Sequence, residues 1–563
     1  MKLRTSFFNI HILKKNLTRF APVWVLFAVA EVLGVLSFGM GKPAHLAREM
    51  VQIMGPVSVF HCAYALIVAA CLFGDLFDSR LCNGLHAMPV RREGWLITNL
   101  VSGFLFALIP AAAGGIVAAI ALREYAWIAL VWQTTSLLQF FFFFGVAVFS
   151  AMCAGKRLGM IAIYGIVNLL SLLIYLVVST IYQPMLYGVV ISDDWFRVFC
   201  PMVSLVSRAY LEGTCDMTFG FSFLRWLPEN WCYLWICAGV GAVFYALSWP
   251  LYRKRHLETA GDFLSFRPAR SFFLVAYTFG CGTFLYYFAE FIALDGNYLF
   301  LSTGMVVGYF TGWMLLERTS KVFTGKVLMG FAAFAVLFTG SMGLTLMDPL
   351  GVETYIPPAE KIESVSFYPT GSSYIYTMQR DYSGWYITDP EEIAQVQKLH
   401  SQMLAAPHDK PGDRVIIDVQ YRLKNGTKVY RNYEVLAEDA LAEDLSVFLS
   451  DVRAIFHTND WEELTRNLRE IRVYIHDSSQ GTEYEILDPA QQEALLEAIR
   501  MDAEAGNMAQ PSNLHSNKTI VASIDVSWMQ QMNSGEGSRW EMAQVYADCV
   551  NTVAFLKTLR AAS

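Results

Sequence analysis

The stretch QFFFFFGVAVFSAM, residues 139–152, contains no charged side chain. It belongs to a longer uncharged run, residues 127–153, which exceeds the roughly 20 helical residues needed to cross a hydrocarbon core of about 30 Å. A second stretch, WVLFAVAEVLGVLSF at residues 24–38, has the same character apart from one glutamate, Glu31. Runs of this length predict membrane-spanning helices.

The chain as a whole has the composition of a membrane protein with a polar tail. Its 563 residues are 55% hydrophobic and 16% charged, whereas soluble domains carry about 25% charged residues. The apolar runs stop near residue 350. We therefore expect a polytopic α-helical membrane protein with about nine membrane helices, followed by a C-terminal α+β extracytoplasmic domain. The expected spans are residues 20–40, 55–73, 96–122, 127–153, 159–182, 231–252, 271–293, 298–316 and 326–347.

Lysine and arginine are concentrated in alternate connections between these spans. The positive-inside rule places such connections in the cytoplasm. The rule therefore predicts a cytoplasmic N-terminus and an outer location for the tail after residue 347. The basic residues assigned to the inner face are Lys14, Lys15, Arg19, Arg80, Arg91, Arg92, Lys156, Arg157, Arg253, Lys254, Arg255, Arg318 and Lys321.

The tail differs from the rest in charge and contains a repeated pattern. Residues 351–563 hold 32 acidic and 18 basic residues, while the remainder holds 17 and 24. A strand, a helix opened by Asp-Pro, a strand pair and a closing helix occur twice, about 100 residues apart. Asp389 and Asp488 are expected N-caps, and KNGT at residues 424–427 predicts a tight hairpin. The tail is thus expected to form two tandem α+β repeats, residues 351–465 and 466–563.

Several kinds of chemistry find no support in the sequence. There is no GxxxxGK[ST] phosphate-binding loop, no CxxC and no HExxH pattern. Among ionisable residues in the expected spans, Glu31 lies near the middle of the first and Glu290 near the outer end of the seventh. Glu31 is a candidate for a substrate pathway because a carboxylate in lipid is costly; a protonated or hydrogen-bonded packing residue is the alternative. A protein of this kind that moves a solute would need another polypeptide to supply energy.

Between the second and third expected spans lies GDLFDSRLCNGLHAMPVRREGW, residues 74–95, which we call the platform segment. It combines an amphipathic stretch with a proline and a basic pair. The orientation above places it in the cytoplasm. A basic loop of this kind is often only a membrane anchor, and a docking surface for a cytosolic partner is the second interpretation.

The pattern Gly-x-His-x-x-Pro at residues 84–89, followed by Arg91 and Arg92, resembles the permeases of ABC type-2 exporters. It is similar to Gram-positive members whose loop reads HSLPISRK, with HAMPVRR here; Ala87 and Met88 replace the usual Ser and Leu. The resemblance covers a six-helix permease-like domain, residues 1–252. Three additional helices in residues 253–350 and the repeated tail resemble a subgroup that carries an extracytoplasmic domain.

The resemblance implies that the platform segment contains a coupling helix seated in a groove of a cytosolic ATPase. Leu85 to Pro89 would form an apolar knob, Gly84 would let the chain turn, and Pro89 would end the helix. Arg91 and Arg92 would meet lipid phosphates. The implied coupling residues are Phe77, Leu81, Gly84, Leu85, His86, Met88, Pro89, Arg91 and Arg92.

The expected function is the membrane permease subunit of an ATP-driven exporter of an amphipathic substrate, such as a peptide, an antibiotic or a lipid-like molecule. We expect no enzymatic activity, no metal and no cofactor in this chain, with ATP bound by its partner. The expected partners are cytosolic ABC ATPase subunits, a second permease of the same or a related chain, and membrane lipids, but no nucleic acid. The expected location is the cell membrane. The alternative is a membrane-anchored receptor or sensor whose extracytoplasmic repeats bind a ligand.

Overall fold

The computed structural model of the chain describes residues 7–37, 43–87, 91–192, 194–207, 223–292, 298–370, 385–406, 414–436, 440–476, 482–486, 488–508, 519–532 and 535–562. The chain divides into two compact units. Unit 1 comprises Met1–Thr180 and Asp193–Gly340, and unit 2 comprises Ile181–Ser192 and Ser341–Ser563. Each unit is described by itself.

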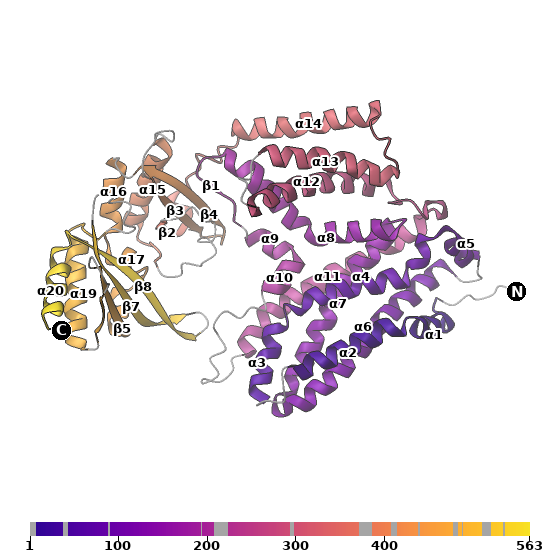
Figure 1. Cartoon of the computed structure of the whole chain (residues 1–563), viewed down its shortest axis with the longest axis horizontal. Helices are drawn as coiled ribbons and strands as arrows, with labels where there is room; N and C mark the ends of the chain where they lie inside the picture. Colours follow the sequence, from indigo (N-terminus) through magenta and orange to yellow (C-terminus); the bar gives the residue numbers. More distant parts are fainter. Residues whose placement is uncertain are drawn as a thin grey trace. The chain divides into compact units, whose positions relative to one another are not determined.

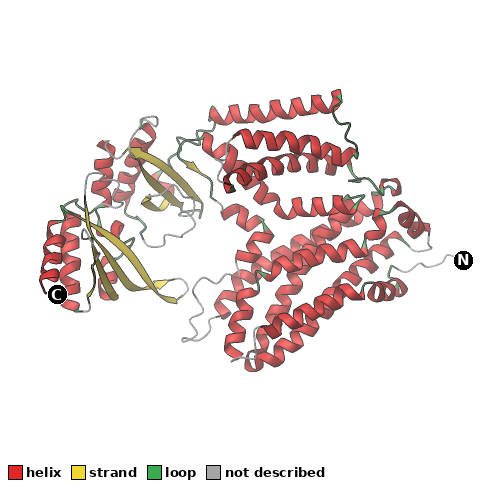
Figure 2. Cartoon of the chain, in the orientation of Figure 1, coloured by secondary structure: helices red, strands yellow, loops and turns green. Residues whose placement is uncertain are grey.

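Unit 1 is built almost entirely from helices (Figures 1 and 2). Its longer helices are α2 (Ala21–Ser37), α4 (Val57–Leu72), α6 (Arg92–Leu122), α7 (Ala126–Cys153), α8 (Arg157–Val177), α11 (Phe223–Lys254), α12 (Arg267–Phe291), α13 (Tyr298–Glu317) and α14 (Gly325–Leu346). Its shorter elements are α1 (Ile10–Arg19), α3 (Pro43–Ile53), η1 (Gly74–Phe77), α5 (Ser79–Ala87), η2 (Arg123–Tyr125), α9 (Asp194–Phe199), α10 (Pro201–Ser207) and η5 (Leu257–Thr259). The turns η3 (Val178–Tyr182) and η4 (Gln183–Met185) follow α8.

Fewer helices reach the length of a full membrane span than the roughly nine that the sequence predicts. Each of the nine expected spans corresponds to a helix, but seven described helices are long and apolar enough to cross a membrane. An eighth results if α1 and α2, bent by 62°, form one span. The expected second span is α4, whose 16 residues extend about 24 Å at 1.5 Å per residue. It is short because the chain turns at residues 54–56, and the helix begins only after Pro56.

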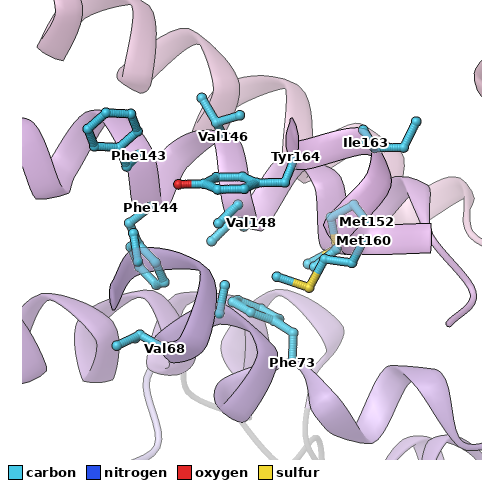
Figure 3. Packing of buried hydrophobic residues seen from close by; sticks show 14 of the residues in the cluster. Val68, Phe73, Phe143, Phe144, Val146, Val148, Met152, Met160, Ile163 and Tyr164 are labelled. Carbon is cyan, nitrogen blue, oxygen red and sulfur yellow. The ribbon is translucent and has the colours of Figure 1, made fainter. Parts of the chain in front are cut away.

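The phenylalanine run of α7 forms the core of unit 1. Helix α7 packs against α4, α6, α8 and α11, and Phe140, Phe142, Phe143 and Phe144 are all buried. Figure 3 shows two of these rings in one cluster with Val68 and Phe73 on one side and Tyr164 on the other. The interior of the unit is thus packed by aromatic and aliphatic side chains from at least three helices.

The outer surface of unit 1 is also apolar. Ile120, Leu130, Val336 and Leu337 are each more than two thirds exposed, and the only buried residue of α14 among those described is Val327. Apolar side chains exposed over whole helices are unfavourable in water and favourable in a lipid hydrocarbon phase. The long apolar helices and this surface indicate a membrane-embedded protein.

Unit 2 contains two four-stranded antiparallel sheets. The first consists of β1 (Val189–Val190), β2 (Ile362–Thr370), β3 (Arg414–Leu423) and β4 (Lys428–Leu436), in the order β1-β4-β3-β2. The second consists of β5 (Leu468–Ile475), β6 (Thr482–Ile486), β7 (Ile520–Met532) and β8 (Gly535–Tyr546), in the order β6-β5-β7-β8. The helices are α15 (Pro390–Ala405), α16 (Ala440–Leu449), α17 (Val452–Ile455), α18 (Trp461–Arg466), α19 (Pro489–Glu504) and α20 (Val550–Ala562), with a 3₁₀ turn at η6 (Ala359–Lys361).

Each sheet has its own hydrophobic core. Alternate residues of β3 and β7 are buried, as expected for strands with one face against helices. In the first core these strand residues pack with α15, and in the second with α19. The first core includes Ile417, Val419, Tyr421, Val396 and Met403, and the second includes Ala522, Ile524, Val526, Leu495 and Ile499.

The local signals predicted in the tail are confirmed. The Asp389 side chain accepts hydrogen bonds from the backbone N–H groups of Glu391 and Glu392, and Asp488 accepts one from Ala490. The hairpin between β3 and β4 places Gly426 at φ +81°, and its N–H donates to the Leu423 carbonyl. This is a three-residue hairpin turn with the glycine in the left-handed region, so the Asn-Gly pair marks the correct position.

Strand β1 comes from an unexpected part of the chain. It lies in Ile181–Ser192, the connection that follows α8, yet it pairs with β4 through Val189 opposite Arg431 and Val190 opposite Tyr430. The preceding Gly188 has φ +68°, and a Cβ there would clash with the Tyr433 ring. Glycine is therefore required for this close approach.

A buried polar network lies next to β1. His400 of α15 is fully buried, with Nδ1 at 2.9 Å from the Tyr421 hydroxyl and Nε2 at 2.6 Å from the Tyr433 hydroxyl. The buried Arg431 guanidinium donates to the carbonyls of Val352 and Tyr355, at 2.6 and 3.0 Å. Arg431 thus connects the segment around Val352 and Tyr355, at the start of the tail, to the sheet that contains β1.

Candidate functional site: the platform segment and a buried polar cluster

The platform segment forms two short helices with a defined start. After η1, the Asp78 carboxylate accepts hydrogen bonds from the backbone N–H groups of Arg80 and Leu81, at 2.8 and 3.2 Å. Asp78 has extended backbone angles and therefore acts as the N-cap of α5. One face of α5 is anchored, since Cys82 is 1% exposed, while Leu81 is 52% exposed.

A buried arginine holds the base of this segment. Arg255 follows α11 and is 5% exposed; its guanidinium donates to the carbonyls of Ala151 at the end of α7, at 2.9 Å, and of Leu76 in η1, at 3.0 Å. Burial lowers the pKa of this guanidinium, but arginine remains charged at neutral pH. The positive charge also complements the negative end of the α7 dipole. Arg255 therefore ties the platform segment to both α7 and α11.

The basic connections of unit 1 meet at the same end as the platform segment. Ala154 and Leu264 form an antiparallel bridge between the α7–α8 and α11–α12 connections. Arg318, after α13, donates to the Gly261 carbonyl at 2.9 Å, and Arg19 lies 3.9 Å from Asp75. Together with the contacts of Arg255, these interactions link all five connections that the lysine and arginine pattern assigns to the inner face.

The predicted coupling residues fall into three groups. Phe77 is buried and so belongs to the base of the segment, whereas Leu81 is exposed. Gly84, Leu85 and His86 lie within α5, which continues to Ala87; Gly84 is therefore inside a helix, and the expected turn there is not present. The Asp78 cap starts this helix, and one glycine within it costs only about 1 kcal/mol.

The remaining predicted residues lie beyond α5. Met88 and Pro89 lie outside the residues that the structure describes. Arg91 directly precedes α6, and its guanidinium carbon lies 5.2 Å from the centre of the Phe7 ring. Arg92 is the first residue of α6. Lipid phosphates as their partners stay a prediction.

Glu31 lies in a second site, inside the helical unit. It is 8% exposed on α2, and its Oε1 atom is 3.7 Å from Nε2 of His61 on α4, which is 2% exposed. Nδ1 of His61 lies 2.9 Å from Oε1 of Gln139 on α7, whose Nε2 donates to the Met54 carbonyl at 3.0 Å. Gln133 of α7 is buried nearby; a Cβ at Gly114 would be within about 3.3 Å of both Glu31 Oε2 and Gln133 Nε2. We call Glu31, His61, Gln133 and Gln139 the polar cluster.

The polar cluster has unfilled hydrogen-bonding capacity. Glu31 Oε2 and both polar atoms of the Gln133 side chain are buried without a hydrogen-bond partner. Buried polar atoms are normally paired, and each exception calls for an explanation such as a catalytic role or an ordered water or ion. The cluster is therefore a second candidate site, and Glu31 is its member predicted from the sequence.

Sequence reasoning missed Asp78, Arg255, His61 and the two glutamines. His61 had a clear signal, because it is an ionisable residue inside an expected span. Asp78 precedes Ser-Arg-Leu as an N-cap precedes a helix. Arg255 had no distinguishing signal, because it lies in a basic run typical of any inner connection. Among the described residues, no group of three or more His, Cys, Asp or Glu is placed to hold a metal ion.

Comparisons with protein-family models, with curated proteins and with solved structures find no match to this chain. The arguments that follow therefore rest on the chain's own residues and geometry.

Proposed function

We propose that this chain is the membrane permease subunit of an ATP-driven ABC exporter. The observation that carries the proposal is the way in which α5 is attached to the rest of unit 1. This helix is capped by Asp78, exposes Leu81 and is fastened through Arg255 to α7, the core helix of unit 1. A force applied to α5 by a cytosolic partner would act directly on the packed centre of the helical unit.

The remaining features of the proposal follow from the charge distribution. The basic connections face the cytoplasm and its anionic leaflet, and residues 351–563 lie outside the cell membrane. Two cytosolic ABC ATPase subunits bind and hydrolyse ATP, and a second permease, identical or related, completes the transporter. The chain itself is neither an enzyme nor a cofactor-binding protein. The substrate is amphipathic, a character that suits passage through a lipid-embedded unit.

For unit 2 we propose two tandem copies of one α+β module. Strands β2, β3 and β4 are adjacent in their sheet in the same order and orientation as β5, β7 and β8 in theirs. In both sheets a helix capped by Asp-Pro precedes the last two of these strands. This correspondence supports an internal duplication.

A membrane-anchored receptor is the second candidate. The observation that favours it is the incorporation of Ile181–Ser192 into unit 2, because a ligand that shifts this sheet would pull on the chain that leaves α8. A receptor of this kind has no need of an ATPase.

Purification of the tagged full chain from its native membranes in mild detergent tests the choice. The exporter proposal predicts co-purification of a polypeptide that contains a phosphate-binding loop, together with ATP hydrolysis by the purified complex. A chain that purifies without an ATPase and without ATP hydrolysis, while binding a ligand through unit 2, would support the receptor and contradict the exporter.

A further inference from the structure

The hydrogen bonds of the polar cluster determine which nitrogen of His61 carries a proton. The Met54 carbonyl can only accept, so the Gln139 side chain presents its amide nitrogen to it, at 3.0 Å. The other end of that side chain, Oε1, then faces His61 Nδ1 at 2.9 Å. Because this oxygen can only accept, Nδ1 must carry a hydrogen. In neutral His61 the lone pair is consequently on Nε2.

That lone pair faces a carboxylate oxygen. Glu31 Oε1 is 3.7 Å from Nε2, and without a proton between them both atoms would be electron-rich acceptors. One proton removes the conflict, whether it resides on Glu31 or on His61, and in either case the pair has no net charge. Loss of that proton would leave a single negative charge in the interior, which is strongly unfavourable.

No other group around the pair replaces this proton. From α4, Tyr64 is the nearest titratable neighbour, and its hydroxyl donates to the Phe106 carbonyl at 2.8 Å. Cys62 is paired with Tyr164 of α8, at 3.3 Å. Helices α6 and α7 present uncharged groups, Gly114 and the two glutamines, and α10 contains no ionisable residue. None of these groups supplies a charge that could balance the pair.

The space beside Glu31 limits what can bind. A methyl group added at Gly114 would already lie 3.1 Å from Glu31 Oε2 and 3.3 Å from Gln133 Nε2, which is tighter than ordinary van der Waals contact. The gap at Gly114 is therefore too small for a metal ion with its ligand shell or for an organic ammonium group. A proton fits there, and Glu31 Oε2 and Gln133 are unpartnered atoms able to pass or stabilise it.

We infer that Glu31 and His61 form a proton-binding site in the interior of the helical unit, which holds one proton on one or the other of the two side chains and releases it. This goes beyond the proposed exporter function and does not depend on it. Gln139 holds His61 in the tautomer that faces Glu31, and Gln133 is the polar group nearest to the free carboxyl oxygen. Proton release and uptake at this pair would couple the packing of α2, α4 and α7 to pH.

Infrared difference spectroscopy on the full chain in lipid nanodiscs tests the inference. Spectra are compared between pH of about 4 and about 9, an interval that includes the pKa values of free glutamate and histidine side chains. The wild type should show the loss of one proton, seen at a carboxyl or an imidazole group. Glu31→Gln should abolish this signal, because the glutamine amide donates to neutral His61 Nε2. His61→Gln should remove any imidazole part of this signal, because the Glu31 carboxyl is then the only group of the pair that can change its protonation.

The matched control is Glu290→Gln, which makes the same change at an exposed glutamate of α12 and should keep the signal. A signal that survives unchanged in Glu31→Gln would overturn the inference. If the variants do not fold, histidine-selective ¹⁵N NMR of the wild type decides the matter. One of the 10 histidines should keep a proton on Nδ1 over the whole pH range; absence of such a histidine would equally overturn the inference.

Discussion

The buried His400 of unit 2 should make that unit sensitive to acid. Neutral histidine has one donor and one acceptor nitrogen, and the hydroxyls of Tyr421 and Tyr433 match both. Burial, with a smaller contribution from the neighbouring Arg431, lowers the pKa of His400 from 6.5 to about 4. The folded protein therefore holds His400 neutral at pH values where the unfolded chain would be protonated.

The sign and size of the effect follow from proton linkage. Between pH 6.5 and about 4 the unfolded state binds more protons than the folded state, so the free energy of unfolding falls as the pH falls. With these two pKa values the loss amounts to about 2 kcal/mol at pH 5 and about 3 kcal/mol at pH 4, relative to neutral pH. The free energy of unfolding returns to its neutral-pH value as the pH rises above 6.5.

Hydrogen exchange of the β3 and β4 amides in the full chain, corrected for the intrinsic pH dependence of exchange, measures this free energy. His400→Gln should lower the stability at neutral pH but flatten the decline between pH of about 6.5 and 4 by about 3 kcal/mol. Ser401→Ala, a change at the exposed neighbour on the same helix, should keep the wild-type decline. An unchanged slope in His400→Gln would refute the assignment of His400 as the buried neutral group.

Three further predictions concern strand β1, the anchoring by Arg255 and the orientation of the chain in the membrane. Residues 341–563 expressed alone should lose the cover that β1 gives to β4. Fusion of residues 181–192 to this fragment should raise its free energy of unfolding by about 2 kcal/mol, the amount expected for reburying one or two apolar side chains. Equal urea midpoints for the fragment with and without the fusion would contradict the role of β1. Arg255→Met leaves buried carbonyls without a donor and should destabilise the full chain by about 2–3 kcal/mol, which would be measured as a lower Tm in detergent. The control Arg253→Met, at an exposed position, should change the stability by less than about 0.5 kcal/mol. Similar Tm shifts in the two variants would argue against the anchoring by Arg255. Protease added to intact cells should cleave within residues 351–563, and protection until lysis would reverse the proposed orientation.

The elements with strong local signals were predictable from the sequence. The apolar runs located the helices of unit 1, because length and lack of charge are what a hydrocarbon phase demands. Asp389 and Asp488 located the starts of α15 and α19, because capping and proline at the first turn are local effects. Glu31 was recognisable because a carboxylate within an apolar run requires an explanation.

The features that depend on contacts between distant segments were not predictable. Strand β1 has only two residues, and its role depends on an edge of β4 far along the chain. Arg255 resembles any other basic residue after a span until the carbonyls of Leu76 and Ala151 surround it. The same holds for Gln133 and Gln139, whose importance depends on helices α2 and α4 packing against α7.

The most direct test of the exporter proposal is the effect of one exposed leucine on partner binding. Tagged wild type, Leu81→Asp and the control Leu350→Asp, in which an equally drastic change is made at an exposed leucine of unit 2, are purified from native membranes. If α5 is the ATPase contact, its exposed apolar residue Leu81 should contribute about 2 kcal/mol or more to binding, which corresponds to a loss of about 30-fold in affinity. The account predicts that wild type and Leu350→Asp retain the ATPase and its ATP hydrolysis, while Leu81→Asp inserts normally but loses both. Retention of the ATPase by Leu81→Asp at the wild-type level would contradict the account.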